Sequence, residues 1–288
     1  MGPGFKYHIV TITAIFLALT VGLVIGSLYV SPQLADKQGK EIRKLQSSLQ
    51  LSLSQQKRQL QHYGEFIEQT RPTLLKNKLN GTKVAIIQTG DYPDVVSKVK
   101  EALQSAGALV VSETSIESAY QQSDEMMKKN LEALHTEDIR IPTDRQSLAR
   151  LVAEILTGKY LASDDILKTL VDARFLRTTK ESNYQIPVRY FVFVVGSRTD
   201  YPVRVEQIDK PLIDALHDQK AIVVACEPLE SAFSDIPIYN EQNLEVATVD
   251  NVDTDLGACA LVFALKGDKK HYGVKETAKQ LLPSMVTP

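Results

Sequence analysis

The pattern of hydrophobic positions changes sharply after residue 35. Residues 7–35 contain no Asp, Glu, Lys or Arg, and residues 8–30 are predominantly apolar. A helix needs about 20 such residues to cross the hydrocarbon core of a bilayer. Tyr7 and Tyr29 lie near the two ends of the run, where aromatic rings favour the membrane interface. The pattern predicts one N-terminal transmembrane helix.

A cleaved signal peptide is the alternative interpretation of this run. The apolar core of a signal peptide usually covers about 7–15 residues, which is shorter than the run found here. Residues 31–35 also make a poor cleavage site, because they lack the usual pattern of two small residues separated by one residue of any type. We therefore expect residues 1–35 to be an N-terminal tail and an uncleaved anchor.

Small residues recur every four positions along the predicted span, at Ala14, Ala18, Gly22 and Gly26. This spacing leaves one helix face on which a second helix could approach closely. Glycine is also common in membrane helices that do not associate. The stripe slightly favours self-association of the span.

Residues 36–80 form the second predicted part, which is polar, rich in Gln and poor in Gly and Pro up to residue 71. Apolar residues follow a coiled-coil pattern with one four-residue step, at Ile42, Leu45, Leu49, Leu53, Leu60, Ile67 and Leu74. The intervening positions carry Gln56, Tyr63 and Thr70, which make a weak seam. We favour an oligomeric stalk. The alternative is one amphipathic helix that folds back on the following domain.

Residues 81–288 alternate between buried-strand patterns and helical patterns. The apolar run 83–88 is followed by a turn at 89–93, by helical spacing over 95–103 and by a second apolar run at 108–112. This order predicts a β-α-β unit, and hence an α/β domain with a Rossmann-like, doubly wound, mostly parallel sheet.

The remaining elements continue this alternation. Strands are predicted at residues 189–195, 220–225 and 244–249. Helices are predicted at residues 123–134, 144–156, 164–175, 203–218, 255–265 and 272–282. Asp253 or Thr254 can cap the helix at 255–265, because either side chain can accept from exposed N–H groups.

The net charge gives no support for a nucleic-acid-binding protein, and the cysteine content excludes a disulfide-rich protein. The net charge is -2 and the isoelectric point is about 6.2, which gives no case for nucleic-acid binding. Cys226 and Cys259 are the only cysteines, so there is no disulfide framework. We expect two unpaired thiols in the core.

No motif of a common enzyme or cofactor site is present. The first β-α turn holds only Gly90, and the chain has neither a dinucleotide fingerprint nor a phosphate loop. Cys226 follows a predicted strand, where α/β folds often place a nucleophile, but it lacks the flanking glycines of a sharp nucleophile turn. We favour a structural cysteine, and we expect neither an enzyme nor a bound cofactor.

Metal ligands are sparse. Asp250, Asp253 and Asp255 could hold a hard cation, although helix capping explains them more simply. Copper prefers clusters of Cys, Met or His. The five histidines are scattered, at His8, His62, His135, His217 and His271. Cys226 and the three aspartates are therefore only weak metal candidates.

The charges that flank the span leave its orientation open. Lys6 precedes the span, and Lys37, Lys40, Arg43 and Lys44 follow it. A count of Lys and Arg favours a cytoplasmic location for the C-terminal side. A lone N-terminal anchor more often exports the mass that follows it.

Several segments, in order, resemble the copper transporter family typified by the mycobacterial copper transport outer-membrane protein MctB. These segments are residues 5–10, 16–27, 83–88, 247–254 and 260–265, together with Gly257, Tyr272 and Gly273. The run Val-Asp-Asn-Val-Asp-Thr at 249–254 is the most specific of them.

The resemblance implies a role in copper export or copper homeostasis at the cell envelope, with copper as the transported ion. It also implies a soluble domain outside the cytoplasm. No copper-ligand motif of the family carries over to this sequence. One apolar span cannot enclose a channel, so only an oligomeric pore or an accessory role fits. A structural envelope protein without transport activity is the alternative, and a hydrolase is the third.

Overall fold

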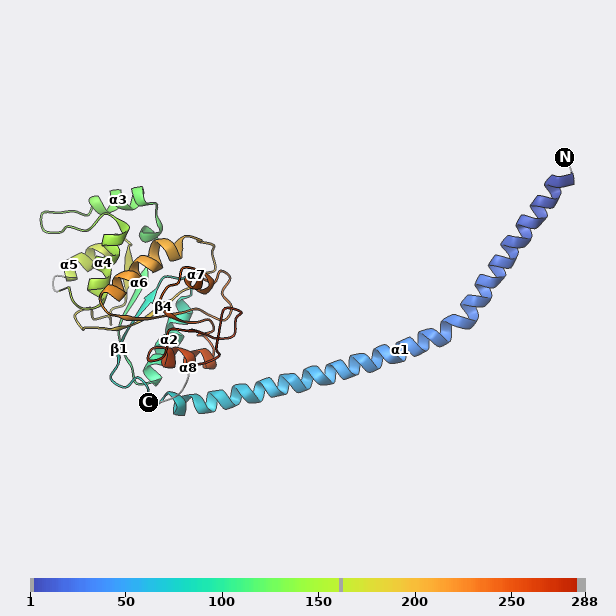
Figure 1. The fold of residues 1–288 in the computed structure, drawn as a ribbon, viewed down its shortest axis with the longest axis horizontal. Coiled ribbons are helices and arrows are strands. Elements are labelled where there is room, and N and C mark those ends of the chain that lie inside the picture. The colour runs from blue at the N-terminus through green and yellow to red at the C-terminus, as the bar shows by residue number, and fades with distance from the viewer. Residues whose placement is uncertain (1–2, 161–162, 284–288) are drawn as a thin grey trace. The chain divides into compact units, whose positions relative to one another are not determined.

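The computed structural model describes residues 3–160 and 163–283. The chain divides into two compact units, residues 1–65 and 66–288, which are described separately here. The division falls inside the first helix, α1 (Pro3–Leu75), which is blue to cyan in Figure 1. The three-part organisation into anchor, stalk and domain stays a prediction.

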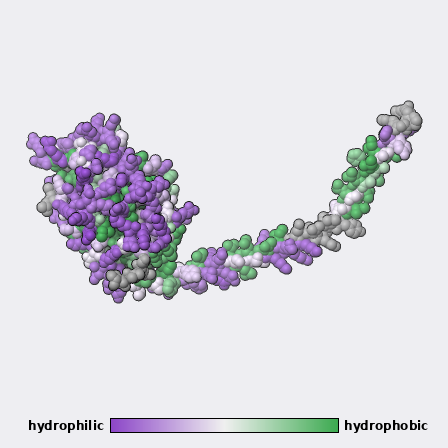
Figure 2. Space-filling view, viewed as in Figure 1, coloured by the Kyte–Doolittle hydropathy of each residue, from purple (hydrophilic) through white to green (hydrophobic). Residues whose placement is uncertain are grey.

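Within the described residues, the first unit consists of the part of helix α1 up to Glu65. Its segment Lys6–Leu28 is long and apolar enough to cross a membrane, and it contains the strongly green stretch near the N-terminus in Figure 2. Thr11 and Thr13 donate hydrogen bonds to the carbonyl oxygens of Tyr7 and Ile9, one turn earlier. These threonines therefore satisfy their hydroxyl groups within the helix, as a span requires.

The same helix continues through the predicted stalk. Its apolar seam is exposed within the chain, with Leu45 at 68%, Leu53 at 56% and Leu60 at 70% of full exposure. Green side chains alternate with purple ones along this part of the helix in Figure 2. The coiled coil stays a prediction, because the structure shows these seam residues only as exposed side chains of a single chain.

The second unit is built on a seven-stranded sheet with the order β3-β2-β1-β4-β5-β6-β7, which confirms the predicted fold class. Only the pair β2–β3 is antiparallel. The strands are β1 (Lys83–Gln88), β2 (Leu109–Ile116), β3 (Leu176–Thr178), β4 (Tyr190–Val194), β5 (Ile222–Cys226), β6 (Ala247–Val249) and β7 (His271–Tyr272).

Both faces of the sheet are covered, because alternate residues of its strands point to opposite sides. Ala85 and Ile87 of β1 belong to one apolar core, and Val84 and Ile86 belong to the other. The first core includes residues of α3 (Asp124–Glu132), α4 (Arg145–Leu156), α5 (Ser163–Asp172) and α6 (Lys210–Asp218). The second includes residues of α2 (Pro93–Ser105) and α8 (Asp255–Ala264).

Side-chain caps fix the starts of three helices. Ser123, Asp144 and Thr254 each accept a hydrogen bond from a backbone N–H three residues later. Thr254 is therefore the cap of α8, one of the two residues proposed from the sequence. Such a cap satisfies one of the helix's unpaired N–H groups and contributes about 1 kcal/mol.

Two stretches differ from the sequence-based prediction. The predicted helix 203–218 starts with a π-helical turn, η2 (Val205–Asp209), before α6. The predicted helix 272–282 is wrong, because the chain instead forms β7 and then turns and bends. Gly273, with φ of +135°, departs from helical geometry at this point. The carboxylate of Asp250 binds the next two backbone N–H groups, of Val274 and Lys275.

The sequence patterns also miss three short elements. These are a single 3₁₀ turn, η1 (Ser118–Gln121), the edge strand β3, and α7 (Ile236–Glu241). All three are too short for a clear apolar period.

The end of α1 is part of the second unit and packs into its core. Leu75 and, just beyond the helix, Leu79 are fully buried in the core that contains α2 and α8. Arg71 forms an ion pair of 2.7 Å with Asp255 in the first turn of α8. The ammonium group of Lys78 lies 5.8 Å from the ring centre of Phe263. The last turns of α1 are thus anchored to α8.

Candidate functional site

The parallel sheet reverses its direction of winding between β1 and β4. From β1 the chain moves outward to β2, and from β4 it moves outward to β5 and β6 on the other side. In open α/β sheets, ligands bind outside the carboxyl ends of the strands at such a switch point. The loops after β1 and β4 are therefore the first place to look for a site.

These two loops lie in direct contact. The N–H groups of Thr89 and Gly90 both donate to the carbonyl oxygen of Val194, at 3.1 Å. A Cβ atom on Gly90 would lie 2.1 Å from the carbonyl oxygen of Gly196. Only glycine fits at position 90, because the clash would be with backbone.

A pocket of about 330 Å³ opens at the carboxyl ends of β1 and β2, beside this contact. Its wall is mostly polar and comes from both sides of the switch point. The lining residues are Gln88, Thr89, Gly90, Asp91, Pro93, Ser115, Ile116, Glu117, Ser118, Gln121, Arg177, Thr199, Tyr201 and Arg204. We call this space the switch-point pocket.

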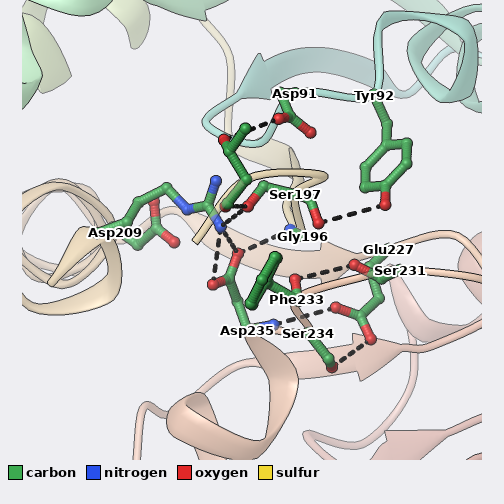
Figure 3. A network of polar contacts seen from close by, with 12 residues as sticks. Asp91, Tyr92, Gly196, Ser197, Asp209, Glu227, Ser231, Phe233, Ser234 and Asp235 are labelled. Atoms are coloured by element: carbon green, nitrogen blue, oxygen red, sulfur yellow. Dashed lines mark hydrogen bonds and ion pairs between the residues drawn. The ribbon is translucent and has the colours of Figure 1, made fainter. Parts of the chain in front are cut away.

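A buried ion pair lies behind the pocket. Arg204 and Asp235 are 3% and 4% exposed, and their closest charged atoms are 2.8 Å apart. Arg204 also donates to the Ser197 hydroxyl at 3.1 Å, and Gly196 N–H donates to Asp235 at 2.7 Å. In Figure 3, Gly196 and Ser197 lie close to the Asp235 side chain, and a dashed line joins Gly196 to Asp235. Such satisfied bonds are needed to offset the desolvation of two buried charges.

Asp209 is a second buried carboxylate in the same cluster. It has no exposed surface, and its Oδ2 accepts a hydrogen bond of 2.9 Å from the Tyr239 hydroxyl. Burial and, next, the Asp235 carboxylate raise the pKa of Asp209 to about 7. Arg204 acts in the opposite direction, but its charge is shared between two carboxylates.

The π-helical turn η2 contains Asp209 and follows Arg204 directly. A π turn adds one residue to a helix and is often found at functional sites. Here both charged residues are buried rather than exposed to solvent.

Glu227 forms a second buried network after β5. It is fully buried, and it accepts hydrogen bonds from Ser234 at 2.5 Å and from Lys275 at 2.6 Å. The N–H group of Asp235 donates to its second oxygen at 3.2 Å, which joins the two networks (Figure 3). Burial raises the pKa of Glu227 above its ordinary value, while Lys275 and Ser234 lower it.

The charged groups on the pocket wall are paired with one another or with backbone. Arg177 lies 2.7 Å from Glu117. Asp91 accepts from the N–H group of Arg198 at 2.7 Å and from the Thr199 hydroxyl at 3.3 Å. The wall therefore presents no unpaired carboxylate.

The metal candidates from the sequence are not brought together. Asp250 binds two N–H groups after β7, Asp253 accepts from Leu229 N–H at 2.7 Å, and Asp255 pairs with Arg71. Cys226 ends β5 and has no exposed surface, and burial raises the pKa of its thiol. A cation at the three aspartates would have to replace these contacts.

Soft-metal ligands are not clustered either. No group of three or more His, Cys, Asp or Glu residues within 3–160 and 163–283 has a geometry that could hold a metal ion. Cys226 and Cys259 are both unpaired and buried, as expected.

The helix-association residues Ala14, Ala18, Gly22 and Gly26 are all exposed in the single chain. A Cβ atom added at Gly22 or Gly26 would meet nothing within 4 Å. Larger side chains at these positions therefore leave the chain's own structure intact.

Sequence reasoning missed the residues of the buried cluster, Arg204, Asp209, Glu227 and Asp235. Only Glu227 carried a usable signal, since it directly follows a strand at the edge where α/β sites form. The others looked like the polar side of a helix or part of a loop.

A family model described as copper transport outer membrane protein, MctB, matches residues 4–283. No curated protein matches the chain.

Proposed function

Because the chain belongs to the MctB family of copper transport outer membrane proteins, we propose that it is a single-span envelope protein that acts in copper export or homeostasis as a homo-oligomer. The observation that carries this proposal is the extent of the match. Residues 4–283 include the apolar segment, the rest of α1 and the α/β domain.

The oligomer is supported by side chains of α1 that have no partner within the chain. Leu45, Leu49, Leu53 and Leu60 are each more than half exposed. Burying such a side chain contributes about 1.5–3 kcal/mol, so water is an unfavourable environment for the seam. The small-residue stripe lies on the same helix and allows close approach in the membrane.

Transport would require more than one copy or another protein. A single apolar helix satisfies its own backbone and encloses no path for an ion. Copies arranged around a central pore, or an accessory role beside another transporter, remain compatible with one span. We place the α/β domain outside the cytoplasm on the family relationship, and we propose no enzymatic activity.

Crosslinking in membranes tests the association of the span. We expect Gly22→Ile with Gly26→Ile to reduce crosslinked oligomers, at a cost of about 1–2 kcal/mol of packing energy. Thr20→Ile is the control, since position 20 lies about 200° around the helix from position 22. Equal crosslinking in all three proteins would contradict the proposed interface.

The stalk is tested in the same assay with a matched pair of leucines. Leu60 and Leu51 are 70% and 62% exposed, but only Leu60 lies on the seam. We expect Leu60→Asp to reduce crosslinking strongly, because a carboxylate would be buried between helices without a partner. Leu51→Asp should crosslink like wild type. If both variants behave like wild type, the helix does not form a coiled coil.

Copper accumulation separates a transport role from the structural alternative. A strain that lacks the gene should accumulate copper, and wild-type protein should restore the normal level. The Gly22→Ile, Gly26→Ile protein should fail to do so, whereas Thr20→Ile should succeed. Normal copper levels in the deletion strain would favour a structural envelope protein.

The anchor and its orientation need two further measurements. N-terminal sequencing of membrane-extracted protein should begin at or near Met1, and a start near Ala35 would indicate a cleaved signal peptide. Protease added to intact spheroplasts should remove the α/β domain. Cleavage only after lysis would place that domain in the cytoplasm.

A further inference from the structure

A group of basic residues follows the apolar segment on the same helix. α1 continues as a helix from the segment Lys6–Leu28 into the predicted stalk. Just beyond that segment it carries four cations, all exposed to solvent: Lys37, Lys40, Arg43 and Lys44. Their place between a membrane span and a stalk limits what they can contact.

The four cations share one face of α1. At about 100° per residue, they fall within an arc of about 120° that starts at Lys37. The seam residues Ile42, Leu45 and Leu49 lie about 80–140° from Lys37 in the opposite direction around the helix. An oligomer that buries the seam therefore turns the cations outward. We call these four residues the cationic face.

The carboxylates of this stretch do not cancel its charge. Residues 36–44 hold four basic and two acidic residues, a net charge of +2. Glu41 lies about 40° from Lys37 on the side of the seam, outside the arc of the cations. The side of α1 that faces away from the seam is therefore positively charged.

Two of the cations lie within reach of lipid head groups. With a rise of 1.5 Å per residue, Lys37 and Lys40 are about 14 Å and 18 Å along α1 beyond Leu28. The head-group layer is about 5–8 Å deep, and attraction acts over a further distance of about 8 Å. Lysine can also extend its stem back toward the interface. Arg43 and Lys44, at about 22 Å and 24 Å, lie at the limit of this range.

We propose that the cationic face of α1 binds the anionic head groups of membrane lipids, with Lys37 and Lys40 nearest to the bilayer. Lipid is the favoured partner because the span already holds these two residues beside it. A positive charge near an anionic bilayer strengthens binding by up to about five-fold. The proposal rests on the proposed membrane anchor, but it is independent of copper transport.

Electron spin resonance of spin-labelled lipids tests this proposal on the full-length protein in phosphatidylcholine bilayers. The probes are spin-labelled phosphatidylglycerol, which is anionic, and spin-labelled phosphatidylcholine, which has no net charge. The fraction of each probe whose motion the protein restricts gives its relative association constant. We expect phosphatidylglycerol to associate about two- to five-fold more strongly. At about 1 M salt, where the screening length is about 3 Å, the preference should disappear.

Two double variants link the preference to the cationic face. Lys37→Gln with Lys40→Gln should remove at least half of the preference for phosphatidylglycerol, and Gln keeps the helix propensity. Lys57→Gln with Arg58→Gln is the control, because it removes the same charge from exposed positions of the same helix. These two residues lie about 44 Å along α1 beyond Leu28, so the control should behave like wild type.

Each outcome supports or overturns the proposal. A preference that is lost in Lys37→Gln, Lys40→Gln and kept in the control supports it. Restricted lipid without any preference in wild type would overturn this inference and leave the anchor intact. Equal losses in both double variants would overturn it as well, because total charge would then explain the preference. If neither lipid is restricted, the span is not in the bilayer, and the anchor falls together with this inference.

Discussion

The buried carboxylate of Asp209 makes the stability of the domain depend on pH in an unusual direction. Asp209 has no exposed surface, and its Oδ1 has no partner among the described residues. Arg204 is already paired with Asp235, so one positive charge serves two carboxylates. Burial of the Asp209 carboxylate and, next, its repulsion by the Asp235 carboxylate disfavour the ionised form, which raises the pKa of Asp209 to about 7.

The sign of the effect follows from proton binding. In the unfolded chain Asp has a pKa of about 3.9, so only the folded state holds this proton between about pH 4 and pH 7. The stabilisation is full at low pH and is lost as pH rises through the folded pKa. Three pKa units correspond to about 4 kcal/mol.

Replacing this carboxylate by an amide removes the titration. Asp209→Asn has the same shape, can still accept from Tyr239, and stays neutral at every pH. Between about pH 5 and pH 8, wild type should lose about 1–3 kcal/mol more unfolding free energy than the variant does. For a domain of this size that is a difference of about 2–12 °C in melting temperature.

The measurement is thermal unfolding of the full-length protein in detergent at several pH values. The chain has no Trp, so near-ultraviolet circular dichroism of its tyrosines is the signal. Asp214→Asn is the control, because Asp214 lies on α6 with its side chain 59% exposed. The buried Glu227 also affects the pH dependence of unfolding, but it does so equally in wild type, Asp209→Asn and Asp214→Asn. Parallel pH curves for wild type and Asp209→Asn would refute the reasoning.

Three further predictions concern the contacts that hold the C-terminal half together. Gly257→Ala should destabilise by about 1–3 kcal/mol or prevent folding, because the new Cβ would lie 1.9 Å from Asn251 O; a melting temperature equal to wild type would contradict this. Asp250→Ala loses two charge-assisted bonds and should cost about 2–3 kcal/mol, seen as faster hydrogen exchange at residues 273–283. Asp255→Asn should cost only about 0.5–1 kcal/mol, with the loss reduced at high salt, because its ion pair with Arg71 is partly exposed.

The fold was largely predictable because its signals are local. A strand buried on both faces is a short apolar run, and β1, β4 and β5 are such runs. The starts of α3, α4 and α8 each have a capping side chain in the sequence. The order of these elements then limits the sheet to a mostly parallel one.

The buried cluster was not predictable because its members are far apart in the sequence. Arg204 and Asp235 are separated by 31 positions, and only the fold brings them together. Asp209 lies in a helical stretch whose charged residues normally face water. The helix predicted at 272–282 does not form for a similar reason. Asp250, which is 24 positions before Val274, accepts a hydrogen bond from the Val274 N–H group and so helps to fix the backbone there.

Residues 249–254, which lie within the stretch that the family model matches, contact several parts of the domain. Asp250 holds the turn after β7, Asp253 holds the loop after β5, and Thr254 caps α8. The next residue, Asp255, pairs with Arg71 near the end of α1. These contacts join the last turns of α1, the sheet and the C-terminal segment. Asp250, Asp253 and Asp255 each already have a protein partner, so these contacts give all three carboxylates a structural role.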